Sequence, residues 1–482
     1  MARRRPGCFR PGRVAFYYCL SFVVLVLVVN IVILHHGFTE MEAGGAMSPE
    51  EASDINALDE NGQLRLKIVN EVGQYNILER RHRKLMVNAV ENYDDGITEG
   101  SHFTSPLLNC HDIANLSDLV YLASGWTKAV YRGNFKGRAV AIKIVDTSGQ
   151  DVTTCTKNGM LFETCLEKAS QKILKEISIL QALPHDNVIK VLGFCVPDQE
   201  VGITRHSKVA MVTELGESVD LIKLLQMSWE DRLRISLDIT NLIKFLGDTP
   251  YGSMAMNDFR RQQFVVVNGQ LKLSDVDDAG FGDPSCSHDE ECSLQCSSSN
   301  FTYRMPCILG ICRGFNKKRN TYNAGRHFTT FLLPHGAPSS LRPLVDKIVS
   351  GYSSLDRSQE TLADELEEVV LLYKTGWYLG SDTERNKKTE YAVYENRDLP
   401  GMFDYRCRFS ISGSGCTVSV FDRKEAEELC DKDPECSGFV LSSQRTWTGR
   451  IVIHLKNGFK EPTRSTHTHL YIKPSLVTNS SH

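Results

Sequence analysis

Two aspartates, Asp258 and Asp275, stand on either side of a short hairpin pattern, where carboxylates could accept a proton or bind a metal ion. Residues 264–273 form two short apolar or alternating runs around Asn268-Gly269, the strongest short-range signal for a two-residue turn. Closing this hairpin brings Gln263 beside Asp275. We therefore expect carboxylates and an amide to gather at the open end of the hairpin.

A second group of residues could bind phosphate. The segment "LASGWTKAVYRGNFKGRAVAIK" places Gly125 in a turn that is followed by two strands, the second of which ends at Lys143. A glycine lets backbone N–H groups approach phosphate oxygens closely, and a lysine one strand later can reach the same oxygens. Glu176 could pair with Lys143, or only with Lys172 at the i,i+4 spacing of one helix.

Alternating strand and helix patterns surround these residues. Residues 140–145, 188–194 and 208–215 have the apolar runs of strands. Residues 166–183 carry a helical apolar stripe that stops at Pro184. The pattern further along the chain is mainly helical, so the elements that must position the site are mixed.

Lys143 at the end of "AVAIK", Glu176, Asp258 and Asp275 together resemble the signatures of protein kinases, which are a glycine-rich loop, V-A-I-K, H-R-D-L-x-x-x-N and D-F-G. The resemblance runs from about Leu122 to the mid-270s and loosens toward about residue 375. It implies an α+β, bilobal protein-kinase-like fold with a disulfide-rich insertion. The implied boundaries are 106–380 for a divergent kinase domain, about 116–215 for its N-lobe, about 216–380 for its C-lobe and 286–312 for the insertion.

The resemblance also implies roles for single residues. Lys143 would hold the α- and β-phosphates of ATP, Glu176 would orient Lys143, and Asp258 would accept the proton of the substrate hydroxyl. Asp275 and Gln263 would bind Mg²⁺ or Mn²⁺, so the implied cofactors are ATP and one of these ions. The implied ATP-binding residues are Ala123, Ser124, Gly125, Trp126, Thr127, Lys128, Val130, Lys143, Glu214 and Leu215.

The sequence departs from the kinase pattern at several positions. The H-R-D position reads Met256-Asn257-Asp258, and D-F-G reads Asp275-Val276-Asp277. Ala123 and Lys128 stand at the outer glycine positions of the loop. No A-P-E follows, and the cysteine-rich stretch stands in its place. We expect the extra carboxylates of Asp277 and Asp278 to be solvated rather than to bind metal.

The stretches "SGWTKAVYR", "DFRRQQFVV", "LPHGAPSSLRPL" and "TWTGR" resemble the extracellular tyrosine kinases of the vertebrate lonesome kinase family, over most of the chain after about residue 110. This resemblance implies an enzyme that transfers phosphate from ATP to tyrosines of secretory-pathway and extracellular proteins, with roles in skeletal development. Tyrosine specificity comes from the resemblance alone. The alternative is a secreted pseudokinase scaffold or binding protein, which the degraded glycine loop and the missing His-Arg favour.

The N-terminal region predicts entry into the secretory pathway. Residues 14–35 are long and apolar enough to cross a bilayer, and the arginine-rich residues 1–13 before them predict a cytosolic basic tail. The apolar segment is expected to be a signal anchor, which would attach the chain to the membrane, or a cleaved signal peptide. Residues 36–105 read as a luminal stalk. The implied location is the lumen of the secretory pathway, including the Golgi, and the extracellular space.

The cysteines agree with this location, because all but Cys8 and Cys19 of the 15 cysteines follow the apolar segment. Disulfides are favoured over a zinc site, since no paired C-x2-C unit is present. Cys195, after an apolar run, is the expected cysteine without a disulfide. The disulfide candidates are Cys286, Cys292, Cys296, Cys307, Cys312, Cys407, Cys416, Cys430 and Cys436.

Asn115, Asn300 and Asn479 match the N-glycosylation acceptor pattern of secreted proteins. Residues 392–475 predict a small disulfide-stapled module, faintly similar to PAN/apple domains, that binds substrate or matrix or only packs on the kinase lobe. The net charge of −4 supplies no argument for nucleic acid as a partner. The expected partners are therefore secretory-pathway and extracellular protein substrates.

Overall fold

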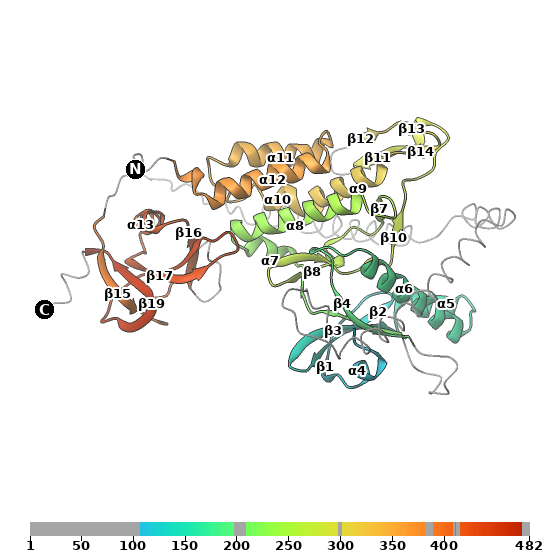
Figure 1. Cartoon of the computed structure of the whole chain (residues 1–482), viewed down its shortest axis with the longest axis horizontal. Coiled ribbons are helices and arrows are strands. Elements are labelled where there is room, and N and C mark those ends of the chain that lie inside the picture. Colours follow the sequence, from blue (N-terminus) through green and yellow to red (C-terminus); the bar gives the residue numbers. More distant parts are fainter. Residues whose placement is uncertain are drawn as a thin grey trace, which may run out of the picture. The chain divides into compact units, whose positions relative to one another are not determined.

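The structure is a computed structural model that describes residues 107–196, 209–296, 301–380, 389–407, 410 and 415–474 (Figure 1). All of these residues belong to one compact unit, Ile97–His482. The predicted basic tail, apolar segment 14–35 and stalk lie outside the described residues. Within the described ranges, no helix is both long enough and apolar enough to cross a membrane.

The N-lobe is a five-stranded antiparallel sheet in the order β1-β2-β3-β5-β4, with helices α5 and α6 beside it (Figure 1). Apolar side chains of α6, among them Ile173, Ile177 and Leu180, are buried at helical spacing and join the main core. The predicted strands and the helix before Pro184 are confirmed. The N-lobe elements are α4 (Cys110–Ala114), β1 (Ser117–Ser124), β2 (Lys128–Phe135), β3 (Arg138–Val145), α5 (Gln150–Lys157), α6 (Phe162–Ala182), β4 (Val191–Cys195) and β5 (Ala210–Glu214).

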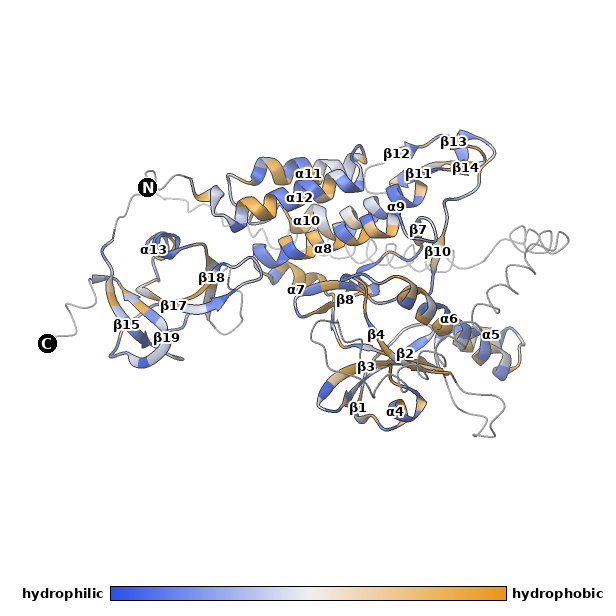
Figure 2. Cartoon of the chain, in the orientation of Figure 1, coloured by the Kyte–Doolittle hydropathy of each residue, from blue (hydrophilic) through white to orange (hydrophobic). Residues whose placement is uncertain are grey.

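The C-lobe is built around α8, whose buried residues recur along its whole length and join the same core. Helices α9 and α12 pack on α8, and α11 packs on α12 (Figure 1). Figure 2 shows hydrophobic stretches along α8 and along the strands of the N-lobe sheet. The helices of this lobe are α7 (Leu221–Gln226), α8 (Trp229–Gly247), α9 (Phe315–Ala324), a π-helical turn (Gly325–Thr329), α10 (Thr330–Leu332), α11 (Arg342–Ser354) and α12 (Gln359–Lys374).

The predicted hairpin is confirmed as strands β8 (Phe264–Val267) and β9 (Gln270–Leu273), to which β6 (Glu217–Ser218) adds a third strand. Asn268 and Gly269 both have positive φ, at 52° and 77°, as a type I′ turn requires. A second small pair, β7 (Met254–Met256) with β10 (Ala279–Phe281), joins the segments before and after the hairpin.

Six disulfides are present among the described residues, and two predictions about them are wrong, the one for Cys195 and the one that made Cys296 a disulfide candidate. Cys195 is bonded to Cys110, because β4 and α4 lie together at the sheet edge, so it is not the cysteine without a disulfide. Cys296 belongs to none of the six; it is buried, and its sulfur donates to the carbonyl of Leu294. The disulfides are Cys110–Cys195, Cys155–Cys165, Cys286–Cys307, Cys292–Cys312, Cys407–Cys416 and Cys430–Cys436.

The cysteine-rich insertion consists of two small hairpins with their own apolar cluster. Asp283, just before it, accepts backbone N–H groups of Gly314 and Asn316 at 2.7 and 3.0 Å and so ties the insertion to the start of α9. Its strands are β11 (Ser293–Cys296), β12 (Phe301–Arg304), β13 (Cys307–Ile308) and β14 (Ile311–Cys312).

The C-terminal module is a second five-stranded sheet, in the order β15-β19-β17-β18-β16, with one helix and its own core. Two disulfides, Cys407–Cys416 and Cys430–Cys436, lie within it, as the prediction of a disulfide-stapled module requires. The elements are β15 (Ala392–Asp398), β16 (Cys416–Val420), α13 (Arg423–Lys432), β17 (Gly438–Arg445), β18 (Ile451–Lys456) and β19 (Thr463–Ile472).

Polar contacts join this module to the C-lobe. Glu230 of α8, only 2% exposed, accepts hydroxyls of Ser419 at 2.6 Å and of Thr448. Arg450 of the module donates to Tyr378, which follows α12, at 2.6 Å, and to Glu425 at 2.8 Å. The module therefore packs on the C-lobe through these polar contacts.

The ion pair of Arg450 with Glu425 generates a stability prediction. Both side chains are buried, at 2% and 11% exposed, so Arg450→Met leaves the Glu425 charge without a cation. We expect it to lower the free energy of unfolding by about 3–5 kcal/mol. Urea unfolding of the secreted ectodomain would measure this. Arg464→Met, on the exposed face of β19, is the control and should change it by less than about 0.5 kcal/mol; equal losses for both variants would contradict the prediction.

Candidate active site

Strand register places two lysines on one face of the N-lobe sheet. Lys143 of β3 lies opposite Val130 of β2, and Lys128 lies opposite Val145. Because side chains alternate along a strand, Lys128 and Lys143 point to the same side as diagonal neighbours. Both are buried, at 6% exposed.

Helix α6 presents one buried carboxylate to both lysines. Glu176 is on the apolar stripe of α6 and is 0% exposed. Its Oε1 accepts from Lys143 Nζ at 2.7 Å, and its Oε2 accepts from Lys128 Nζ at 2.5 Å. The predicted pair of Lys143 with Glu176 is thus present. Lys172, the alternative helical partner, pairs instead with Asp151 at 2.7 Å.

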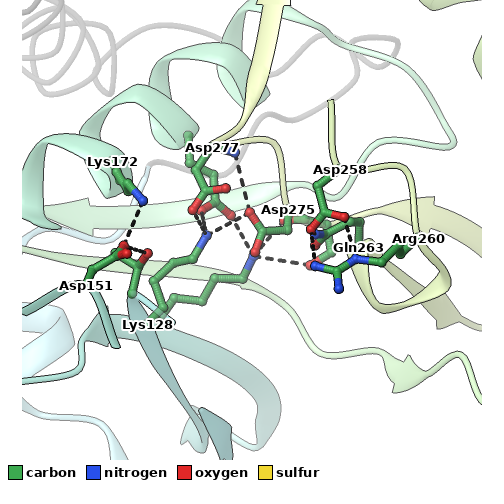
Figure 3. A network of polar contacts seen from close by, with 12 residues as sticks. Lys128, Asp151, Lys172, Asp258, Arg260, Gln263, Asp275 and Asp277 are labelled. Atoms are coloured by element: carbon green, nitrogen blue, oxygen red, sulfur yellow. Dashed lines mark hydrogen bonds and ion pairs between the residues drawn. The ribbon is translucent and has the colours of Figure 1, made fainter. Parts of the chain in front are cut away.

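The two ammonium groups differ in their remaining partners. Lys143 donates to Ser274, to its carbonyl at 2.6 Å and its hydroxyl at 3.2 Å. Lys128 contacts the carboxylates of Asp275 at 2.7 Å and Asp277 at 3.0 Å (Figure 3). Lys128 stands at a position where kinases have a glycine, so it adds a second cation that such a loop lacks.

The expectation that Asp277 is solvated is wrong, because its side chain is 13% exposed and paired with Lys128; Asp278 is exposed, as expected. Burial favours a higher pKa for Asp275, but the ammonium groups of Lys128 and Lys143 outweigh it and lower the pKa to about 2. Burial raises the pKa of Asp277 to about 6, since the attraction of Lys128 only partly offsets it and the Asp275 charge adds to it. The pKa of Lys128 is raised, because its three carboxylate neighbours outweigh its burial.

Asp258 lies between β7 and the hairpin in a separate group of contacts (Figure 3). Both carboxylate oxygens accept from the guanidinium of Arg260, and Oδ2 also accepts from the Nε2 of Gln263. Gln263 thus presents its amide nitrogen to Asp258. Its backbone carbonyl accepts the N–H groups of Ser274 and Asp275 at 2.8 and 3.1 Å, which closes the open end of the hairpin as predicted.

Other interactions stand in place of those that the missing H-R-D and D-F-G residues would make. Met256 and Val276 are both buried in the main core, where they are 3% and 2% exposed. Asn257 donates to the carbonyl of Asp278 at 2.7 Å and accepts from Arg319 at 3.0 Å. Hydrophobic packing and one amide therefore join the Asp258 segment to the Asp275 segment without the usual histidine and arginine.

The loop that contains Gly125 is held by α5. The Gly125 N–H donates to the Lys128 carbonyl at 2.8 Å, and the Asp151 N–H donates to the carbonyl of Trp126 at 3.1 Å. Thr127, which is buried, donates to the Asp151 carboxylate. Trp126 is 73% exposed at the tip. Of the predicted ATP-binding residues in this loop, the structure therefore buries Thr127 and Lys128 and leaves 123–126 exposed, with Val130 between these extremes.

Side chains from both lobes hold the hairpin. Glu214, the last residue of β5, accepts from Lys272 of β9 at 2.7 Å. The Leu271 N–H donates to Asp238 of α8 at 2.8 Å, and the Leu271 carbonyl accepts from Asn187, which follows α6, at 2.9 Å. These contacts explain how a four-residue strand can position Asp275. Leu215, which follows β5, is half-buried.

The donor set fits a hard divalent cation. Carboxylate oxygens of Glu176, Asp275 and Asp277 lie within 4.8 Å of one another, and Mg²⁺ and Mn²⁺ prefer such oxygen ligands. The predicted ligand Asp275 belongs to this group. The second predicted ligand, Gln263, donates its amide nitrogen to Asp258, and its role as a metal ligand stays a prediction.

Sequence reasoning missed the roles of Lys128, Asp277, Arg260 and Asn257. One signal was available for Lys128, which precedes Val130 by two residues in a strand and so faces the same buried side. For the other three residues, no periodicity distinguishes a site residue from a solvated one. Of the predicted glycosylation sites, Asn115 is exposed at the end of α4, and Asn300 and Asn479 lie outside the described residues.

Comparison with known proteins agrees with this geometry. Residues 120–266 match the family described as protein tyrosine and serine/threonine kinase. Human extracellular tyrosine-protein kinase PKDCC is 40% identical over 378 residues, which cover 78% of this chain and 75% of that protein. Human protein O-mannose kinase is 23% identical over 36% of this chain and 46% of its own length. The serine/threonine-protein kinase PCRK1 of Arabidopsis thaliana is 25% identical over 35% of this chain and 38% of its own length.

The two lobes, the lysine–glutamate pair and the matched family model define a protein kinase domain, and the predicted kinase-like fold is confirmed. More narrowly, the chain belongs to the family of the extracellular tyrosine-protein kinase PKDCC. ATP and a divalent metal ion are the general cofactors of such a domain.

Asp238, which holds the hairpin, generates a pH prediction. Burial raises its pKa from about 4 to about 6 in the folded chain. The folded state therefore binds this proton more tightly than the unfolded state, and stability from this group is present below about pH 4 and is lost as the pH rises to about 6. Asp238→Asn removes this titration, so relative to the parent it should gain roughly 3 kcal/mol of stability between pH 4 and pH 7.

Urea unfolding of both proteins at a series of pH values would measure this difference. Asp364→Asn, exposed on α12, is the control and should follow the parent at every pH. A constant difference between Asp238→Asn and the parent across the range would contradict the prediction.

Proposed function

We propose that the protein is an active kinase that transfers the γ-phosphate of ATP to tyrosine hydroxyls of secretory-pathway and extracellular proteins. The observation that carries this proposal is the joint presence of the buried Lys143–Glu176 pair, the Asp258 carboxylate and the Asp275 carboxylate around one hairpin. Loss of the base or of the metal-binding carboxylate would abolish transfer, and the chain has an aspartate at each of these two positions.

In the proposed reaction, the substrate hydroxyl oxygen forms a bond to the γ-phosphorus while the bond from that phosphorus to ADP breaks. Asp258 accepts the hydroxyl proton, and Arg260 and Gln263 fix its carboxylate in place. Lys143, oriented by Glu176, faces the phosphates. A divalent ion bound by Asp275 and Asp277 would neutralise phosphate charge when present.

The choice of substrate and compartment rests on other support. The human relative that is 40% identical is named an extracellular tyrosine-protein kinase. Six disulfides are typical of an oxidising compartment. We therefore propose action in the secretory-pathway lumen and outside the cell. A role in skeletal development is proposed from the family resemblance.

The second candidate function is a secreted scaffold without phosphate transfer. The observations that favour it are the replaced H-R-D residues, the loop with one glycine, and the folded C-terminal module on the C-lobe. Binding of ATP alone does not distinguish the candidates, since a scaffold can bind nucleotide. Turnover does.

The test is phosphate transfer by the ectodomain secreted from a eukaryotic host, with ATP, Mg²⁺ or Mn²⁺ and a mixture of secretory proteins. We expect phosphotyrosine with the parent and a decrease in rate of about 10²–10⁴-fold with Asp258→Asn, because the proton acceptor is lost. Lys143→Met should also abolish transfer. Mass spectrometry would identify the modified residues.

Lys374→Met and Asp364→Asn are matched controls, because both side chains are exposed on α12, away from the site; they should retain the parent's rate. Phosphoserine without phosphotyrosine would keep the kinase and contradict the tyrosine assignment. Equal signals from the parent and both site variants, all folded, would establish the scaffold instead.

A further inference from the structure

Lys128 makes contacts that a phosphate-binding loop residue does not need. Its side chain is 8% exposed and contacts three carboxylates, with Nζ at 2.5 Å from Glu176, 2.7 Å from Asp275 and 3.0 Å from Asp277. An ammonium group has three N–H donors. One lysine thus has a carboxylate for every donor (Figure 3).

These are the carboxylates that suit a divalent ion. The oxygens of Glu176, Asp275 and Asp277 lie within 4.8 Å of one another, and Lys128 Nζ is within 3.0 Å of all three residues. A cation on the same oxygens would lie beside the ammonium group, and two like charges at such a distance repel strongly in a buried site. The ammonium of Lys128 and a metal ion therefore compete.

Lys143 does not compete in the same way. Two of its three contacts are to Ser274, a backbone carbonyl and a hydroxyl, which are not part of the carboxylate group. A cation at Asp275 and Asp277 leaves these contacts intact. The two lysines therefore have separable roles.

We propose that Lys128 is an internal cation that holds Asp275 and Asp277 until ATP binds, and then turns to the phosphates so that a divalent ion can take the carboxylates. When the ammonium group of Lys128 moves away from the carboxylates, the phosphates of ATP become its anionic partner. Lys128 begins β2 directly after the loop with Gly125, whose residues are implied to bind ATP, so this inference rests on the proposed function. Metal and nucleotide binding are thereby coupled through one side chain.

The test measures Mn²⁺ binding to the intact secreted ectodomain by electron paramagnetic resonance, without turnover, in the absence and presence of ADP. In the parent, ADP should tighten Mn²⁺ binding by about tenfold or more, within the usual range of coupling between sites. Lys128→Met should bind Mn²⁺ about tenfold more tightly than the parent without nucleotide, because a like charge is removed. The increase in Mn²⁺ affinity that ADP causes should be smaller in Lys128→Met than in the parent, by the same factor.

Two further variants make the result specific. Lys128→Arg keeps the charge and should keep weak Mn²⁺ binding without nucleotide. Lys172→Met removes an ammonium group from the nearby Asp151 pair, outside the carboxylate group, and should match the parent. An Mn²⁺ affinity of Lys128→Met equal to that of the parent overturns the proposal. The proposal is also overturned if ADP leaves the Mn²⁺ affinity of the parent unchanged, and this measurement needs no variant.

The readout also separates this inference from the proposed function. Mn²⁺ affinity does not require phosphate transfer, so the predicted pattern in a protein without kinase activity would support the role of Lys128 and contradict only the proposed function. Phosphate transfer by the parent, together with an unchanged Mn²⁺ affinity in Lys128→Met, would support the proposed function and contradict the role of Lys128.

Discussion

The buried charge of Glu176 is the constraint on which the arrangement of the site depends. A carboxylate that is 0% exposed is stable only with cations or donors around it, and α6 supplies none. The sheet must therefore bring Lys128 and Lys143 to it, which fixes the distance of α6 from β2 and β3. Through Lys128 the same charge reaches Asp275, so one ion network links the helix, the sheet and the hairpin.

Local contacts of other kinds stand where the kinase pattern has residues that this chain lacks. Protein kinases use an H-R-D histidine and arginine to support the catalytic loop. Here Met256 and Val276 contribute by apolar burial, and Asn257 contributes an amide to the carbonyl of Asp278. The surrounding chain positions the aspartates, so the chemistry of the supporting residues can change while Asp258 and Asp275 keep their places.

Much of this arrangement is local and could be predicted from the sequence. The turn at Asn268-Gly269 sets the hairpin register, and a strand that ends at Lys143 followed by an amphipathic helix predicts the pair with Glu176. The bond of Cys195 to Cys110 could not be predicted, because it joins segments 85 residues apart. The environment of Asp277 depends on Lys128, a contact across the fold that no spacing encodes.

The departures at the two outer glycine positions have opposite physical meanings. Ala123 leaves the loop exposed and adds no charge, so it is a loss of conformational freedom alone. Lys128 replaces a residue without a side chain by one that spans the site to three carboxylates. In a comparison with the glycine-loop pattern, Ala123 and Lys128 both count simply as a missing glycine. The structure distinguishes them, and it makes the loop of this chain a source of charge for the site rather than a degraded copy of the usual loop.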